Sequence, residues 1–245
     1  MKLKRRMVGL FVVLSMVCGL GCSPRSCSPK EADYEMRDAV VQLTGNHDST
    51  LEASRKATFR ITSIRPQGEA IGTATLFSYK GEQIIVTAAH VVRDAYGAFI
   101  ESRYEPGVER ALELIYYDEE ADIAILLPTA EIDSIKPIKL RTAKLKHMSV
   151  GTKTIYSGYP NNHSLLTIHG WISGFSSNAD IILDTYGWGG ASGSAVFDEK
   201  GRLLGVLSAM DVGMGIFGPT LIPDVIIVIP ATKIDFEALD ILLDK

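Results

Sequence analysis

The sequence has no cysteine after residue 27. Its three cysteines, Cys18, Cys22 and Cys27, all lie close to the start of a chain of 245 residues. The long remainder therefore contains no thiol, and no disulfide can hold a folded domain together there. A domain of this size can be stable without cross-links, because a long chain buries a large fraction of its surface on folding.

The chain also lacks an excess of positive charge. It has 25 Lys and Arg against 29 Asp and Glu, a formal net charge of −4. No basic face is indicated, and nucleic acid is therefore excluded as an expected partner. Internal repeats and low-complexity segments are missing as well, and a hydrophobic content of 46% is that of an ordinary globular protein.

A long hydrophobic run is a further feature that the chain does not have. The apolar run from Met7 to Gly21 has 15 residues, too short for a comfortable membrane span, and it follows four positive charges within residues 1–6. A charged start and a short apolar core are typical of an export signal, which we predict over residues 1–21. Its removal would lower the formal net charge from −4 to about −8.

The residues GLGC that end at Cys22 resemble a bacterial lipoprotein cleavage site, in which the cysteine is lipidated and becomes the new N-terminus. Gly19 stands where such sites usually carry an aliphatic residue, so a plain secretory signal with incidental cysteines is the alternative. Ser23 would direct a lipoprotein to the outer membrane. We expect an exported, lipid-anchored protein of a bacterial cell envelope, with a polar tether and an N-terminal helix or loop over residues 22–50.

Short segments rich in apolar and β-branched residues dominate the chain from residue 57 onward. Residues 72–79 and 82–89, for example, flank the turn sequence YKGE. The other such segments are residues 57–65, 98–104, 111–118, 122–128, 136–140, 152–160, 165–175, 179–185, 194–198, 202–210 and 224–230. About a dozen short strands with turn signals predict an all-β sandwich or barrel system.

Two segments near the end of the chain are not interpreted as strands. Residues 231–245 have apolar residues at helical spacing and predict a terminal helix, with Thr232 and Asp235 placed as a capping box. Residues 211–223 are apolar and rich in glycine. We interpret them as a loop, which would serve either as a wall of a cleft or as a partner surface.

The segment GWGGASGSAV, residues 187–196, surrounds Ser192 with glycines and small residues. One interpretation is a surface turn, since glycine and serine favour turns. The other is a hydroxyl exposed for chemistry, with neighbouring N–H groups directed to one point. A serine nucleophile needs an adjacent base, and the base needs an orienting carboxylate.

His90 and Asp122 are the candidates for these two partners. Among five histidines, His90 alone ends an apolar strand pattern, QIIVTAAHVV, behind two small alanines. The alternative interpretation of His90 is a core histidine whose hydrogen bonds are satisfied within the fold. Asp122 opens the apolar run DIAILLP, where a partly buried carboxylate must find donors. The alternative interpretation of Asp122 is an aspartate that caps the strand or lies on the surface.

The segments TAAHVV, ADIAIL and GGASGSAV resemble, in this order, the three motifs of the trypsin/chymotrypsin-like serine proteases, and most closely their HtrA (Deg) branch. The spacings of 32 and 70 residues between His90, Asp122 and Ser192 are typical of that branch. Weaker similarity covers residues 57–235. The resemblance implies two six-stranded antiparallel barrels, at about 55–145 and 146–232, with a C-terminal helix in a protease domain over residues 51–245.

The resemblance also implies a serine endopeptidase that hydrolyses protein or peptide substrates without a metal or cofactor. Ser192 would be the nucleophile, His90 the general base, and Asp122 the residue that orients the imidazole. The backbone N–H groups of Gly190 and Ser192 would form the oxyanion hole.

Three further residues are expected to bind substrate. Ser208 and Ala209 fall on the strand that lines the cleft, and Tyr186 falls where the base of the specificity pocket is often found. An aromatic residue there predicts small or aliphatic residues before the scissile bond. Trp188 would shield the site or contact substrate, or else anchor the loop by packing.

The chain departs from the family pattern after the nucleophile, where Gly193, Ser194 and Ala195 replace Gly-Gly-Pro. This keeps open an alternative function, a catalytically weak or inactive peptide-binding module on the same fold. An esterase of the α/β-hydrolase type is disfavoured by the order of the motifs. No segment within the 245 residues resembles a PDZ domain, so trimer assembly and PDZ-based regulation are not carried over, and the oligomeric state is open.

Overall fold

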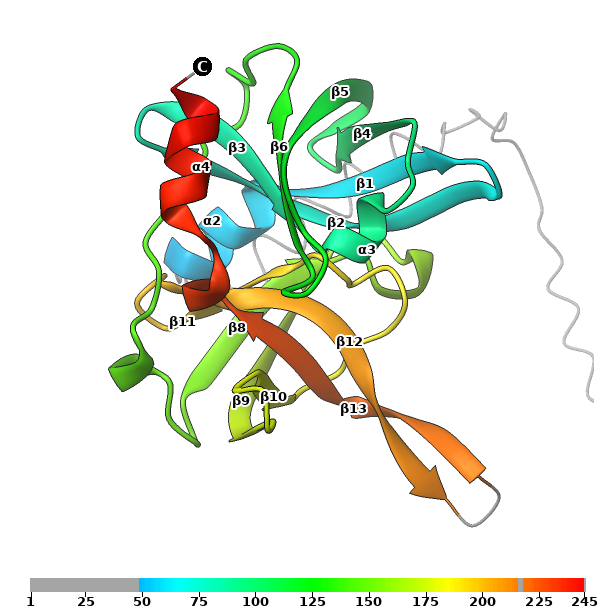
Figure 1. Cartoon of the computed structure of the whole chain (residues 1–245), viewed down its shortest axis with the longest axis vertical. Helices are drawn as coiled ribbons and strands as arrows, with labels where there is room; N and C mark the ends of the chain where they lie inside the picture. Colours follow the sequence, from blue (N-terminus) through cyan, green and yellow to red (C-terminus); the bar gives the residue numbers. More distant parts are fainter. Residues whose placement is uncertain (1–48, 216–217, 245) are drawn as a thin grey trace, which may run out of the picture. The chain divides into compact units, whose positions relative to one another are not determined.

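Two closed six-stranded antiparallel barrels, followed by a C-terminal helix, make up the described part of the chain (Figure 1). The computed structural model describes residues 49–215 and 218–244. The predicted export signal, Cys22, Cys27 and most of the predicted tether lie outside these residues. The predicted all-β class, with two barrels and a C-terminal helix, is confirmed.

The first barrel has the strand order β1-β4-β5-β6-β3-β2 and closes through the pairing of β1 with β2. Its interior is filled by β-branched and aromatic side chains such as Phe59, Phe77 and Ile125, all fully buried. A short strand β7 adds to β2 in parallel. The strands are β1 (Thr58–Arg65), β2 (Gly68–Tyr79), β3 (Glu82–Thr87), β4 (Gly97–Ser102), β5 (Glu105–Asp118), β6 (Ile123–Pro128) and β7 (Ile138–Lys139).

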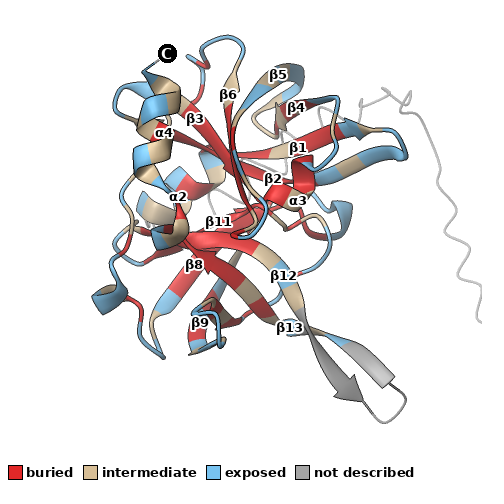
Figure 2. Ribbon diagram, in the orientation of Figure 1, coloured by how far each residue is buried: buried red, intermediate tan, exposed pale blue. Residues whose placement is uncertain are grey.

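The second barrel closes in the order β10-β13-β12-β11-β8-β9. Tyr156, Val196 and Val228 are among the side chains that fill it. Buried residues alternate with more exposed ones along β9 and β10, as expected for barrel walls with one face inside, whereas β8 and β11 are buried along almost their whole length (Figure 2). The strands are β8 (Lys153–Gly158), β9 (Leu166–Phe175), β10 (Ile181–Asp184), β11 (Ala195–Asp198), β12 (Leu203–Gly215) and β13 (Gly218–Pro230).

The segment interpreted from sequence as a loop, residues 211–223, is largely strand. β12 and β13 pair as far as Gly215 and Gly218, and together they project beyond the barrel as a hairpin (Figure 1). The loop prediction is wrong because a high glycine content does not by itself exclude paired strands. A backbone ladder between two neighbouring strands tolerates glycine, which only weakens it.

Short helices flank the barrels. They are α2 (Ser49–Lys56), α3 (Ala89–Val92) and α4 (Phe236–Leu243), with single 3-10 turns η1 (Leu145–His147), η2 (Pro160–Asn162) and η3 (Ala231–Lys233). The predicted capping box at Thr232 is wrong. The cap of α4 is Asp235, whose carboxylate accepts hydrogen bonds from the N–H groups of Glu237 and Ala238. Within the described ranges, no helix is both long and apolar enough to cross a bilayer.

A hydrophobic cluster crosses the boundary between the barrels. It contains the core of the first barrel together with Ile155, Phe197 and Val206 of the second. Phe77 and Phe197 meet with their ring centroids 6.0 Å apart. The core of the first barrel is therefore continuous with part of the second barrel, whose remaining interior forms a separate cluster, and this shared packing fixes the loops that meet at the junction.

Candidate active site

His90 lies on α3, one turn of helix that follows directly after β3. The strand ends at Thr87, two residues earlier than the sequence pattern suggested. Val91 and Val92 are buried and anchor the turn, while the His90 side chain is 38% exposed. Arg65 of β1 donates to the carbonyls of His90 and Val91 at 2.5 and 2.7 Å, which satisfies the end of this short helix.

Asp122 precedes β6 and has a left-handed backbone, with φ of 50°. Such a conformation is uncommon for a non-glycine residue and is concentrated at functional sites. Its carboxylate accepts hydrogen bonds from His90 Nδ1 at 2.8 Å, from the His90 backbone N–H at 2.8 Å, and from Ser208 Oγ at 2.5 Å. These bonds orient the imidazole through Nδ1 and leave Nε2 free to accept a proton.

The pKa of Asp122 lies below its ordinary value of 3.8. Burial alone would raise this pKa, since the side chain is only 16% exposed. The hydrogen bonds from the His90 ring, the Ser208 hydroxyl and the His90 backbone together outweigh the effect of burial. Asp122 therefore remains ionised at neutral pH beside the histidine.

The bond from Ser208 gives a pH-dependent prediction. A carboxyl whose folded pKa is lowered contributes stability above its unfolded pKa, and this contribution is lost as the pH falls through the folded pKa. We expect Ser208→Ala to lower the free energy of unfolding at pH 6, and the deficit to shrink below pH 3.8 as Asp122 takes up a proton. Urea denaturation of the wild type and of Ser208→Ala across this pH range measures the deficit in the free energy of unfolding. A deficit that does not change with pH would contradict the prediction.

Ser192 lies in the loop between β10 and β11, and barrel one helps to hold it. Its carbonyl accepts a hydrogen bond from the Thr73 N–H of β2 at 2.8 Å, and the next residue, Gly193, donates to Leu207 at 2.7 Å. The half-buried Ser192 hydroxyl donates to the Ser208 carbonyl at 3.2 Å. Among the described residues no hydrogen bond joins it to His90. Ser208 links the two sides of the site, because its carbonyl accepts from Ser192 and its hydroxyl donates to Asp122, the partner of His90.

Gly190 has the backbone geometry expected of an oxyanion-hole residue. Its φ is +96°, and a Cβ there would lie 2.5 Å from the Tyr159 carbonyl oxygen. The Gly189 carbonyl accepts from the Asn161 N–H at 2.6 Å, so the Gly190 N–H, on the other side of the same planar peptide, points the opposite way. In the described part of the chain, neither the Gly190 nor the Ser192 N–H has a hydrogen-bond acceptor.

Thr73 is a residue of this site that the sequence reasoning missed. Its hydroxyl donates to the Gly190 carbonyl at 2.8 Å and accepts from the Tyr159 N–H at 3.1 Å. The side chain is fully buried and joins β2 of the first barrel to two segments of the second. In the sequence it is one small residue in a strand pattern, and no signal there distinguishes it.

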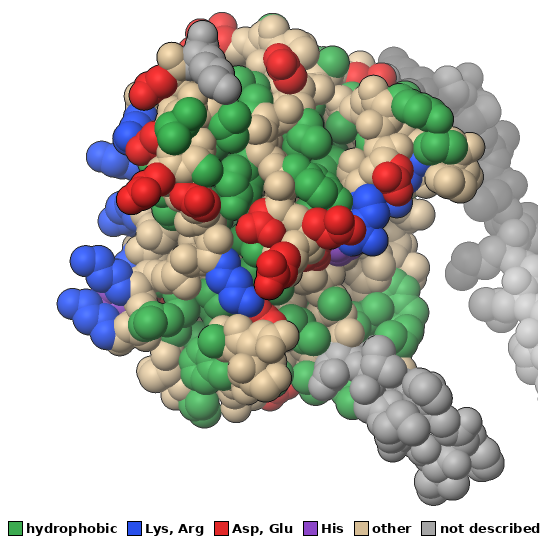
Figure 3. Space-filling view, in the orientation of Figure 1, with side chains coloured by type: hydrophobic (Ala, Val, Ile, Leu, Met, Phe, Trp, Pro, Cys, Tyr) green, Lys and Arg blue, Asp and Glu red, His purple; other side chains and the backbone are tan. Residues whose placement is uncertain are grey.

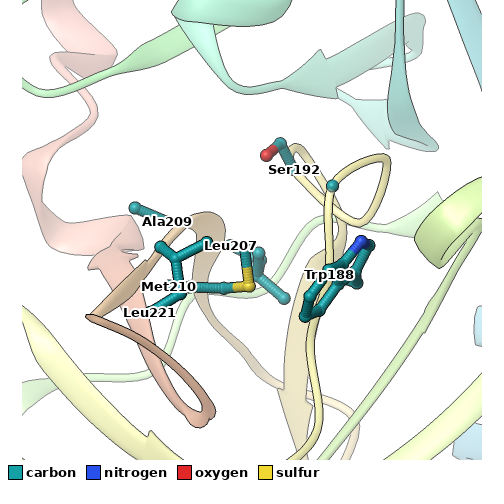
Figure 4. A pocket seen from close by; sticks show the side chains of 7 residues that line it. Trp188, Ser192, Leu207, Ala209, Met210 and Leu221 are labelled. Carbon is teal, nitrogen blue, oxygen red and sulfur yellow. The ribbon is translucent and has the colours of Figure 1, made fainter. Parts of the chain in front are cut away.

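An open pocket of about 270 Å³ lies beside Ser192 (Figure 4). Its lining is mainly apolar: Trp188, Gly189, Ser192, Leu207, Ala209, Met210 and Leu221. Trp188 is 39% exposed and contributes to the pocket wall.

Of the three residues predicted to bind substrate, only one lines the pocket. Ala209 lines the pocket, whereas the Ser208 side chain bonds to Asp122. Tyr186 is not among the lining residues; its side chain is 41% exposed, and its carbonyl accepts a hydrogen bond from Tyr156 Oη.

A surface ion pair lies beside the turn that precedes Asp122. Glu119, in that turn, pairs with Arg93 at 3.3 Å on the surface. Acidic side chains gather across the middle of the face shown in Figure 3. Nowhere in the described ranges do three or more His, Cys, Asp or Glu side chains form a group that could hold a metal ion.

Two antiparallel six-stranded barrels, with a histidine–carboxylate pair on the first and a glycine-rich serine loop on the second, are the arrangement of the chymotrypsin-like serine proteases. The chain belongs to the trypsin-like peptidase family: the family model for the trypsin-like peptidase domain matches residues 72–206, more than half of the chain. The family predicted from the three motifs is thereby confirmed.

Solved structures of HtrA-type proteases share the fold. The serine endoprotease from Yersinia pestis is 18% identical with a TM-score of 0.64, over 82% of this chain and 67% of that one. The HtrA-type protease AlgW with tripeptide is 19% identical with a TM-score of 0.62, over 81% of this chain and 63% of that one. This chain thus corresponds to roughly two thirds of their lengths. No curated protein matches its sequence.

Proposed function

We propose that the protein is an exported serine endopeptidase in which Ser192, His90 and Asp122 act as a catalytic triad. The observation that carries the proposal is the bonded pair of His90 and Asp122, which meets the Ser192 loop at Ser208. The free N–H groups of Gly190 and Ser192 support it, because acyl transfer needs donors where negative charge develops.

The proposed reaction begins when a bound peptide turns the Ser192 hydroxyl from the Ser208 carbonyl to His90 Nε2. Catalytic hydrogen bonds often tighten only when substrate binds. Ser192 Oγ then attacks the scissile carbonyl as its proton moves to Nε2, and Asp122 stabilises the imidazolium. The carbonyl oxygen, as it gains negative charge, accepts hydrogen bonds from the N–H groups of Gly190 and Ser192. His90 next protonates the leaving amine, and a water molecule hydrolyses the acyl-enzyme by the same steps.

The pocket beside Ser192 supports an apolar side chain before the scissile bond. Leu207, Met210 and Leu221 offer it apolar contacts, and no charged side chain is among the lining residues. We therefore propose cleavage after aliphatic residues rather than after Lys or Arg. A peptide library digested with the purified protein measures this preference.

Labelling with a fluorophosphonate probe tests the proposed activity. The probe reacts with a serine only when a base activates it and an oxyanion hole receives the charge. We expect the folded domain to be labelled at Ser192. A well-folded protein that binds peptides but resists the probe would favour the alternative function, a peptide-binding module. The structural reason would be that the Ser192 hydroxyl bonds to the Ser208 carbonyl and not to His90.

Export and a lipid anchor on Cys22 are a separate part of the proposal and rest on the sequence pattern. The test is partitioning of the full-length protein into a detergent phase. We expect Cys22→Ala to move the protein to the aqueous phase, whereas Cys27→Ala leaves it in the detergent phase. Equal partitioning of wild type and Cys22→Ala would exclude the anchor.

A positioning role for Thr73 follows from the same proposal. Thr73→Val keeps the shape of the side chain but removes the hydroxyl that holds the Gly190 carbonyl. We expect kcat to fall roughly 10-fold with little change in KM, the effect of one lost hydrogen bond in the transition state. Thr73→Ser retains the hydroxyl and should keep most of kcat. Equal losses in both variants, or a change in KM alone, would contradict this role.

A further inference from the structure

Positive charge gathers on the second barrel around η1 and the turn between β11 and β12. Figure 3 shows Lys and Arg side chains along the edge of the molecule where residues 139–147 lie in Figure 1. The composition did not indicate such a surface, because the formal net charge of the whole chain is −4. We call this surface the basic patch and define it by six residues, Arg141, Lys144, Lys146, Lys153, Lys200 and Arg202.

Contacts and charge interactions show that the residues of the basic patch are neighbours. Arg141 Nη2 donates to the Lys200 carbonyl at 3.0 Å, which joins the segment before η1 to the β11–β12 turn. The pKa of His147 in η1 lies below its ordinary value of 6.5, first because of partial desolvation and then because of the charges of Arg202 and Lys146. The electrostatic field at η1 is therefore positive.

Neighbouring carboxylates neutralise only part of this charge. Asp198 pairs with Arg202, and Glu199 pairs with Lys153 at 3.2 Å. Across residues 49–215 and 218–244, no carboxylate forms an ion pair with the other four cations, Arg141, Lys144, Lys146 and Lys200. The basic patch thus keeps an excess of about four positive charges, which attracts an anionic surface.

Two large apolar side chains lie in the same surface. Leu145 of η1 is 72% exposed, and Val150 is 65% exposed. The exposure does not come from a poorly anchored segment, because Met148 between them is buried and the Ala143 N–H donates to the Leu203 carbonyl at 2.8 Å. Exposed apolar side chains among basic ones are typical of surfaces that bind the interface of an anionic bilayer.

The described chain begins beside the basic patch. Ser49 starts α2, and the Thr50 hydroxyl lies 3.3 Å from the point where a Cβ at Gly201 would stand. Arg141 Nη2 lies 3.5 Å from the same point. The segment that would link the domain to a lipid on Cys22 thus joins the domain at this surface. The basic patch can therefore meet the bilayer without the link having to pass around the domain.

We propose that the basic patch docks the domain on the anionic headgroups of the bilayer that carries the Cys22 lipid. The proposal goes beyond the endopeptidase function and does not depend on it, whereas the choice of a membrane rests on the proposed anchor as well as on the patch. A bilayer is favoured over nucleic acid or another soluble polyanion, because only a bilayer offers an apolar phase to Leu145 and Val150. The lipid raises the local concentration of headgroups at the patch, so that a weak contact orients the domain.

Vesicle cosedimentation of the mature chain without its lipid, residues 23–245, tests the proposal. This chain contains both barrels and lacks the predicted export signal. We expect it to bind vesicles of phosphatidylcholine mixed with phosphatidylglycerol but not vesicles of phosphatidylcholine alone, and to be released as added salt screens the charges. Lys144→Gln and Lys146→Gln should each lower the partition coefficient about five-fold, the contribution of one cation near an anionic leaflet.

Two further variants separate the patch from net charge and from general polyanion binding. Arg93→Gln removes an exposed cation next to α3 of the first barrel and should bind vesicles as tightly as the wild type. Leu145→Ser keeps every charge. It should weaken vesicle binding roughly 3- to 10-fold, as for partial burial of an apolar side chain, without changing retention on heparin. Circular dichroism checks that each variant is folded.

The possible results distinguish docking from its alternatives. Equal losses in Arg93→Gln and Lys146→Gln would show that net charge alone acts, and docking through the patch would be wrong. Vesicle binding by Leu145→Ser at the wild-type level would assign the patch to soluble polyanions and overturn membrane docking. A wild type that does not bind the anionic vesicles would overturn it as well. Fluorophosphonate labelling of Ser192 tests the endopeptidase function separately, so either proposal can fail without the other.

Discussion

We expect Ser192→Ala to abolish peptide cleavage and to leave the fold unchanged. The alanine has no atom to form the acyl-enzyme, and loss of the nucleophilic serine in serine proteases lowers kcat by about a million-fold. Stability should change little, because the hydroxyl makes one 3.2 Å bond to the Ser208 carbonyl and is half-buried. Release of a fluorescent leaving group measures kcat/KM, and thermal unfolding measures the fold.

The matched control is Ser194→Ala in the same loop. The Ser194 hydroxyl is buried and donates to the Ala191 carbonyl at 2.7 Å, so its removal affects the loop but not the proposed nucleophile. We expect Ser194→Ala to retain activity within roughly 10-fold of the wild type, as for one lost hydrogen bond. Cleavage by Ser192→Ala at a rate near that of Ser194→Ala would mean that the nucleophile is another residue.

Asp122→Asn should lower kcat about 10,000-fold, the loss seen when the triad aspartate is neutralised in serine proteases. The carboxylate accepts from His90 Nδ1, from the His90 backbone and from Ser208. An amide has only one oxygen to accept with, and its NH₂ group favours the wrong imidazole tautomer. Rates measured between pH 6 and pH 10 test this prediction. Hydroxide can replace the missing general base only at high pH, so the loss of kcat should be partly reversed only there.

The neighbouring acid Glu120 supplies the control for Asp122. It is exposed, two residues earlier in the chain. Glu120→Gln removes the same charge from nearly the same place, so a purely long-range electrostatic role would affect both variants alike. We expect the Glu120→Gln variant to keep kcat. A comparable loss in both would show that local charge, rather than orientation of His90, carries the effect.

The parts of the site that lie in continuous sequence could be predicted, and those that depend on the packing of the barrels could not. His90, Asp122 and Ser192 each stand in a local pattern with a recognisable order and spacing. Thr73 meets Gly190 across 117 residues of sequence, and this contact exists only because two barrels pack together. A buried threonine in a strand has the same local pattern whether or not it holds a functional loop.

Local geometry explains the other differences. The apolar run before His90 predicts a strand up to Ala89, but one helical turn suits the same residues, since periodicity cannot separate the two in so short a run. Tyr186 was expected in the pocket from its distance to Ser192 along the chain. In an irregular loop that distance does not fix the direction of a side chain, and Trp188 lines the pocket instead.

The hydrophobic cluster shared by the barrels, with Phe77 against Phe197, has a consequence for how the molecule comes apart. Neither half can separate without exposing apolar surface that the other half covers, so the two halves should melt in a single cooperative transition. Enzymatic activity and near-ultraviolet circular dichroism should then disappear at the same denaturant concentration, and fragments divided between the barrels should regain structure only when mixed.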